Sequence, residues 1–86
     1  MNKENIIKIV EKALEIGDSS RHFASISLST NPNTFPICIS IHNINRNGLP
    51  DGIVSNRFVS NVDSYEMHRD WLNNWITVIR EERKSN

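Results

Sequence analysis

The sequence contains little cysteine and little glycine, and each shortage excludes a class of function. Cys38 is the one cysteine of the chain, so no intramolecular disulfide can form, and a reducing environment is expected. One cysteine and three histidines also lack the CxxC or HxxxH spacing that indicates a zinc site. The three glycines, Gly17, Gly48 and Gly52, are dispersed, which excludes a glycine-rich phosphate-binding loop.

Net charge and long apolar runs are lacking too. Ten basic and ten acidic residues give a formal charge of zero, whereas proteins that bind nucleic acid through phosphate contacts usually carry a basic excess. Glu4 and Lys8 interrupt the apolar stretch near the N-terminus, which is therefore neither a signal peptide nor a membrane span. We expect a single, free-standing cytoplasmic domain of 86 residues that makes no membrane contact.

The clearest pattern in the chain is an amphipathic helix over residues 63–82. At about 100° per residue, the mostly apolar side chains of this segment fall in one half of the helix. This half consists of Tyr65, Met67, His68, Trp71, Leu72, Trp75, Ile76, Val78 and Ile79. Asp63 and Glu66 have the spacing of a capping box, and Val62 and Met67 have that of a hydrophobic staple. Both tryptophans are therefore expected to pack in the core.

A second amphipathic helix is predicted over residues 2–16. Asn2 is a suitable N-cap, and Gly17 stands where a residue in the left-handed conformation commonly ends a helix. The apolar face of this helix consists of Ile6, Ile7, Ile9, Val10, Ala13, Leu14 and Ile16. Such a face needs a sheet or another helix to cover it.

Between the two helices, apolar and polar residues alternate, which predicts β-strands over 22–30, 35–44 and 53–60. Turn-forming residues at 30–34 connect the first two strands as an antiparallel hairpin. Pro36 has no N–H to donate and therefore indicates an edge strand or the start of a strand. The predicted fold is α+β, with a three-stranded antiparallel sheet, two helices packed on one face and the order α-β-β-β-α.

This arrangement leaves the other face of the sheet exposed to solvent, as antiparallel sheets allow. The side chains expected there are polar and carry little charge: Ser25, Ser27, Ser29, Cys38, Ser40, His42, Ser55 and Arg57. The loop over 45–52 is the longest irregular stretch, and long loops carry function more often than short ones. We predict a partner-binding site made of Arg46, Asn47 and Asp51 from this loop, with Arg57 and His42 from the sheet.

No group of residues in the sequence indicates catalysis, a metal or a cofactor. Cys38 and His42 lie on one face of one strand, but four residues separate them by roughly 13 Å, too far for a thiolate–imidazolium pair. His68 is expected to be a buried neutral histidine with one backbone partner rather than a catalytic group. The sequence therefore predicts a non-catalytic protein.

The order α-β-β-β-α with both helices on one face resembles the double-stranded RNA-binding domain over nearly the whole chain. That family contacts RNA through its first helix, its first strand-to-strand loop and lysines at the start of its last helix. Here residues 63–66 include two carboxylates, and Pro32 in the first loop has no basic neighbour. The resemblance implies an alternative function, a nucleic-acid-binding module with Arg21, Arg46 and Arg57 as phosphate contacts.

In size and style the chain also resembles small phage-encoded inhibitors of host defence, the anti-CRISPR proteins among them. Several of those families consist of a three- or four-stranded sheet with one or two helices. The resemblance implies a protein that occupies a surface of a protein or ribonucleoprotein partner, such as a CRISPR effector, and blocks it sterically. A homodimeric accessory protein that pairs through an exposed strand edge is a further alternative.

Overall fold

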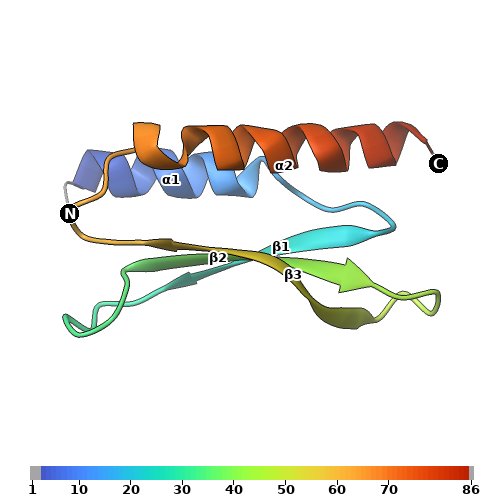
Figure 1. The fold of residues 1–86 in the computed structure, drawn as a ribbon, viewed down its shortest axis with the longest axis horizontal. Coiled ribbons are helices and arrows are strands. Elements are labelled where there is room, and N and C mark those ends of the chain that lie inside the picture. The colour runs from blue at the N-terminus through green and yellow to red at the C-terminus, as the bar shows by residue number, and fades with distance from the viewer. Residues whose placement is uncertain (1–2, 86) are drawn as a thin grey trace.

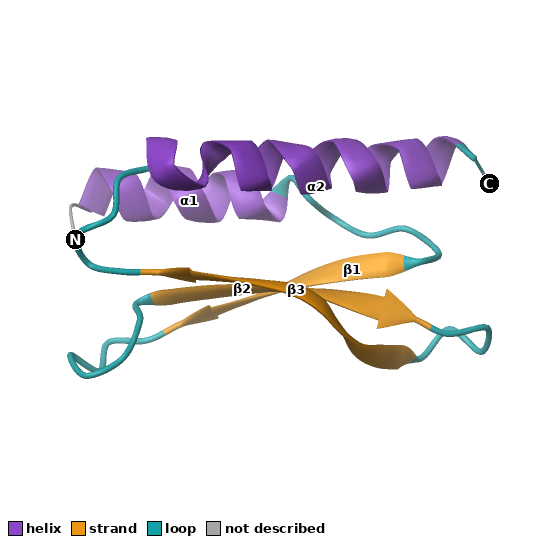
Figure 2. Cartoon of the chain, in the orientation of Figure 1, coloured by secondary structure: helices purple, strands orange, loops and turns teal. Residues whose placement is uncertain are grey.

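The computed structural model describes residues 3–85 and has the predicted α+β architecture. Its elements are α1 (Lys3–Leu14), β1 (His22–Leu28), β2 (Ile37–Ile44), β3 (Pro50–Val59) and α2 (Glu66–Lys84). The strands form one antiparallel sheet in the order β1-β2-β3. Both helices lie on the same face of this sheet and run alongside each other (Figure 1). The opposite face of the sheet carries no helix (Figure 2).

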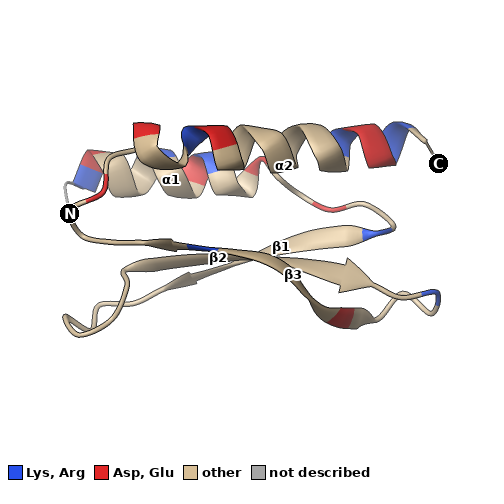
Figure 3. Cartoon of the chain, in the orientation of Figure 1, with Lys and Arg blue, Asp and Glu red and all other residues tan. Residues whose placement is uncertain are grey.

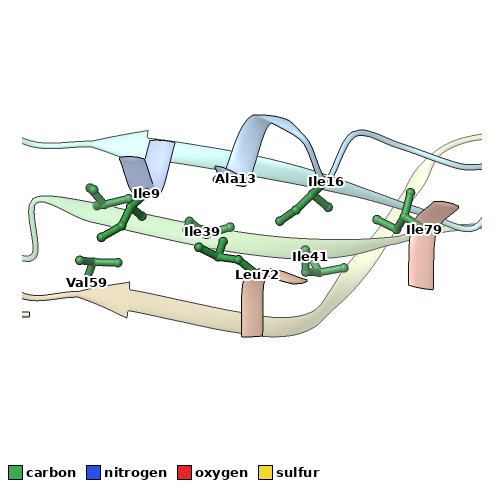
Figure 4. Close-up of a cluster of buried hydrophobic side chains, with 9 residues drawn as sticks. Ile9, Ala13, Ile16, Ile39, Ile41, Val59, Leu72 and Ile79 are labelled. Atoms are coloured by element: carbon green, nitrogen blue, oxygen red, sulfur yellow. The ribbon is translucent and has the colours of Figure 1, made fainter. Parts of the chain in front are cut away.

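The core lies between the helices and the sheet. Alternate residues of β2 point toward the helices and are completely buried, as the period of a strand with one covered face requires. The buried apolar side chains are Ile9, Ala13, Ile16, Ile37, Ile39, Ile41, Val59, Leu72 and Ile79 (Figure 4). Trp71 and Trp75 are partly buried and pack against this cluster, which confirms their predicted position in the core.

The observed ends of α1 and the start of β2 refine the predicted boundaries. The proposed N-cap Asn2 lies outside the described residues, and α1 ends at Leu14 before a turn that leads to Gly17. Gly17 has φ +67°, the left-handed conformation predicted for this position. β2 is the central strand and begins directly after Pro36, so this proline marks the start of a strand and not a sheet edge.

The face of β3 was predicted incorrectly. Two register shifts between β2 and β3 insert extra residues into β3, which begins at Pro50 rather than at residue 53. Beyond the shifts, Ser55 pairs with Ile41 and Arg57 pairs with Ile39. Since these isoleucines face the helices, Ser55 and Arg57 face them too, and not the solvent-exposed face.

The start of α2 was also predicted incorrectly. The helix begins at Glu66, and no side chain caps its first turn. Asp63 instead accepts hydrogen bonds outside the helix, described below. Val62 is 90% exposed and Met67 58% exposed, so they do not form a hydrophobic staple. At its other end α2 continues to Lys84, two residues beyond the predicted end.

Candidate functional site: the exposed face of the sheet

Arg57 is the centre of a polar network between β3 and α2. Its Nε donates to His68 Nδ1 over 2.8 Å, and its Nη2 donates to the Met67 carbonyl oxygen over 2.8 Å. The other ring nitrogen of His68, Nε2, lies 2.9 Å from Asp63 Oδ2. The same carboxylate oxygen accepts the Ser60 N–H over 2.9 Å. One arginine, one histidine and one carboxylate therefore connect β3, the following loop and the first turn of α2.

This network is suited to holding the fold and not to nucleophilic catalysis. Because Arg57 can only donate, His68 Nδ1 must accept, and the proton is assigned to Nε2, which donates to Asp63. An arginine thus stands where a catalytic triad would place its nucleophile. His68 is only 2% exposed and has two side-chain partners, whereas the sequence had predicted a single backbone partner.

A second histidine–carboxylate pair connects the C-terminal end of α2 to the start of β1. His22 Nδ1 lies 2.9 and 2.8 Å from the two carboxylate oxygens of Glu82, and the Ser19 hydroxyl donates to the same carboxylate over 2.8 Å. The His22 ring also meets Trp75 edge-on, with ring centroids 5.7 Å apart. Both ends of α2 are therefore connected to the sheet or its adjoining loops through a buried or half-buried histidine.

The two carboxylates of these pairs are stabilised in their charged form. The backbone hydrogen bond from Ser60 lowers the pKa of Asp63 below its usual 3.8, and His68 acts in the same direction against the opposing effect of burial. Burial tends to raise the pKa of Glu82, but the hydrogen bonds from His22 and Ser19 outweigh it and hold this pKa below 4.5.

The opposite face of the sheet, which no described helix covers, carries side chains of a different kind. Strand pairing arranges its side chains in three rows of three across β1, β2 and β3. The rows are Phe23–His42–Ile53, Ser25–Ser40–Asn56 and Ser27–Cys38–Phe58. We call these residues the outer patch. Ile53 is 55% exposed and Phe58 50% exposed, and no helix lies over them (Figure 2).

The outer patch carries no charged side chain. Residues 22–45, which include all of β1 and β2, contain no Lys, Arg, Asp or Glu. The charged residues concentrate on the helices and at the ends of the sheet (Figure 3). Within β3 the charged residues are Asp51, which precedes the patch, and Arg57, which faces the helices. The patch is therefore a neutral surface on a protein whose helices are highly charged.

Aromatic contacts order the two ends of the outer patch. The rings of Phe23 and His42 stack with centroids 4.6 Å apart and an interplanar angle of 6°. His42 Nε2 also lies 2.8 Å from the Ser25 hydroxyl. At the other end, Phe58 contacts Phe35 of the β1–β2 loop with ring centroids 5.2 Å apart. Between these apolar ends, hydroxyl and amide groups offer hydrogen bonds.

The structure separates the residues that the sequence had grouped into one partner-binding site. His42 lies in the outer patch, and Arg57 lies on the helix side of the sheet. Arg46 and Asn47 are exposed in the β2–β3 connection, and Asp51 is exposed at the start of β3. These three residues therefore lie beside one end of the patch rather than inside it.

The aromatic members of the outer patch were missed at the sequence level. Phe23 was not assigned to a face, and Phe58 belongs to a strand whose apolar residues occur as the pairs 53–54 and 58–59. A paired pattern is compatible with either alternation, so polarity alone placed Arg57 outside. The regular alternation of β2 was the usable signal, because its cross-strand partners must share its faces.

The other surfaces of the described residues show fewer features of a binding site. A shallow hollow lies between the β1–β2 loop and the start of the β3–α2 loop, where it includes Phe35 and Ser60. Among residues 3–85, no three His, Cys, Asp or Glu side chains come together in a group that could hold a metal ion. Within the same range, neither helix is long and apolar enough to cross a membrane.

Comparison with protein-family models, with curated proteins and with solved structures finds no significant match to this chain. The outer patch, as the uncovered face of the sheet, is the candidate binding surface.

Proposed function

We propose that this chain is a small, non-catalytic binding protein that docks a protein partner on its outer patch. The observation that supports this most directly is a whole sheet face that is solvent-exposed, uncharged and bounded by exposed aromatic and aliphatic side chains. Exposed apolar side chains gathered on one surface commonly mark protein–protein interaction sites, and Ile53 and Phe58 of the patch are such side chains. The buried polar networks lie on the other side of the sheet, so occupation of the patch would not disturb them.

The chemistry of the patch favours a neutral protein surface as the partner. Phe23 and Phe58 offer aromatic anchors of the type found at interface centres, and depletion of charge is typical of an interface core. Proteins neutralise the charge of nucleic-acid phosphates with Lys or Arg, and the patch has neither. Arg46 and Asp51 at the neighbouring end of the sheet would then form part of a polar rim.

The steric inhibitor predicted from the sequence is a specific form of this proposal. A small domain that covers a surface of a bacterial defence complex, as an anti-CRISPR protein does, needs a flat docking face and no catalytic group. The outer patch offers an uncovered face of this kind on a twisted sheet. The alternative of a nucleic-acid-binding module would instead need Arg21 and Arg46 to bind phosphate without help from the sheet.

The experiment is capture of partners from a bacterial lysate by the tagged protein, with half of each sample treated with nuclease. We expect a discrete protein that survives nuclease and is lost with the Phe58→Ser variant. The matched control is Met67→Ser, which removes a similarly exposed apolar side chain (58% against 50%) from α2, on the other side of the sheet. Recovery of nucleic acid, with any proteins lost on nuclease treatment, would contradict the proposal and favour the RNA-binding alternative.

A further inference from the structure

We propose that the free edge of β1 pairs with the same edge of a second copy of this chain, at Ile26 and Leu28. The two sheets would then join into one six-stranded antiparallel sheet. This contact is separate from the outer patch, because it uses backbone groups at the rim of the sheet and side chains on its helix face.

The hydrogen-bond pattern shows which backbone groups of β1 are free. In a strand, the backbone groups of successive residues point to opposite edges. The Ala24 N–H donates to the Gly17 carbonyl oxygen over 3.4 Å, away from β2. Ile26 and Leu28 follow Ala24 at intervals of two residues, so their N–H and C=O groups point to this outer edge as well.

Ser29, the residue after Leu28, confirms which way the backbone groups point at the end of β1. The Ser29 N–H donates over 2.9 Å to the carbonyl oxygen of Pro36, on the side of β2, so the preceding residue Leu28 points the other way. Residues 17–19 pair only with the first part of β1, where Ser19 donates to the His22 carbonyl oxygen. Among the described residues, no strand pairs with the outer edge of Ile26 or Leu28.

The two edges of the sheet differ in how they are protected. β3 begins with Pro50 and carries two register shifts, and both features discourage further strand pairing at that end. β1 pairs with β2 in regular register from His22 to Leu28. It also carries no lysine or other charged residue, although charged side chains commonly prevent an edge strand from pairing with another chain. The edge of β1 is therefore the one suited to strand addition.

A second copy fits this edge because the edge is self-complementary. Antiparallel pairing about a twofold axis at Ser27 places Ile26 of each copy opposite Leu28 of the other. Each copy then offers two N–H and two C=O groups to the same number on its partner, so none is left over. Like charges cannot face each other across this axis, because β1 has no Lys, Arg, Asp or Glu.

The side chains of β1 on the helix-covered face of the sheet also favour a second copy of the chain as the partner. Leu28 is 64% exposed and Leu14, at the end of α1, is 67% exposed. A shallow hollow between α1 and β1 is lined by Ala13, Leu14 and Ile26 among others. Paired edges would bring Leu28 of each copy against Ile26 of the other and extend the core across the axis. The dimer would present two outer patches on one continuous face, which allows bivalent binding.

Light scattering of the purified protein under reducing conditions tests the association. We expect a concentration-dependent dimer whose dissociation constant rises at least about tenfold with Leu28→Lys, because each dimer loses two buried leucines and must place two like charges at the apolar junction of the two sheets. The control Leu49→Lys makes the same change at a residue of similar exposure (58%) and should leave the dimer intact. A wild-type protein that stays monomeric at the highest soluble concentration would overturn the proposal.

Disulfide trapping tests the register. Cys38→Ser removes the native thiol, which pairs across β2 with Ser27. In this background Ser27→Cys should crosslink two copies on mild oxidation, since the Cα atoms of facing, non-hydrogen-bonded residues lie about 4.5 Å apart, within disulfide range. Ser25→Cys should not, because its counterparts lie roughly 13 Å apart along the strands. Equal crosslinking at the two positions, or none at either, would overturn the proposed pairing.

Discussion

The two faces of this sheet share one backbone but differ in every chemical respect. The inner face is covered by α1 and α2, is rich in fully buried isoleucine, and holds Arg57 with its partners. The outer face is uncovered, uncharged and only partly apolar. The comparison indicates that stability is concentrated on one side of the sheet, which leaves the residues of the other side free to serve binding.

The three histidines follow the same division. His68 and His22 each pair with a carboxylate and hold opposite ends of α2. His42 lies on the outer face, where its partners are the ring of Phe23 and the hydroxyl of Ser25. Histidine thus connects helix and sheet where a carboxylate faces it, and is part of the outer surface where none does.

Ile39→Ala should give the largest loss of stability. Ile39 is completely buried in the central strand, and truncation of such a side chain costs about 2–5 kcal/mol through lost burial and the cavity left behind. Its neighbour Cys38 points to the outer face, so Cys38→Ala should change the free energy of unfolding by less than about 1 kcal/mol. Urea denaturation measures both, and equal losses would remove the distinction between the faces.

Arg57→Ala should give the next largest loss. It leaves His68 Nδ1 and the Met67 carbonyl oxygen without their donor, at a cost of roughly 1–3 kcal/mol. Arg46→Ala removes an exposed arginine and should stay within about 0.5 kcal/mol of the wild type. Urea denaturation of the two variants side by side is the measurement. A neutral Arg57→Ala would show that the inner polar network does not stabilise the fold.

Acid should weaken the inner side of the molecule first. The pKa values of Asp63 and Glu82 are lower in the folded protein than their usual 3.8 and 4.5, so the unfolded chain binds more protons as the pH falls. Their contribution is therefore complete above about pH 5 and is lost as the pH falls through 4.5 and 3.8 toward the folded values.

The double variant Asp63→Asn with Glu82→Gln tests this pH dependence. It should be less stable than the wild type at pH 7 and should lose less of its stability between pH 5 and pH 3. Melting temperatures across this range are the readout. Parallel curves for the two proteins would show that these carboxylates do not couple folding to protonation.

Phe58→Ser should destabilise the protein less than Ile39→Ala or Arg57→Ala. Phe58 is half exposed, and its tilted contact with Phe35 contributes about 0.5–1.5 kcal/mol. The loss of stability should therefore be smaller than that of Ile39→Ala, as expected if Phe58 serves mainly to bind a partner. A loss as large as that of a core isoleucine would mean that the outer patch is part of the core.

Sequence reasoning predicted the element order, the fold class and the packing of both tryptophans against the core because these follow from periodicity. It failed where one residue had several possible partners. Asp63 has the spacing of a helix cap, but it is recruited by Ser60 and His68, a choice that depends on where the loop lies in space. Arg57 was placed outside by its charge, and its burial depends on the presence of acceptors on α2.

One pair of variants tests most directly whether the outer patch is the binding face. Ser40→Arg places a charge at the centre of the patch, and Asn74→Arg places the same charge on the exposed side of α2. We expect both variants to keep the wild-type melting temperature, and only Ser40→Arg to lose the protein partner in nuclease-treated capture. Equal partner recovery with the two variants would show that the partner binds elsewhere on the protein.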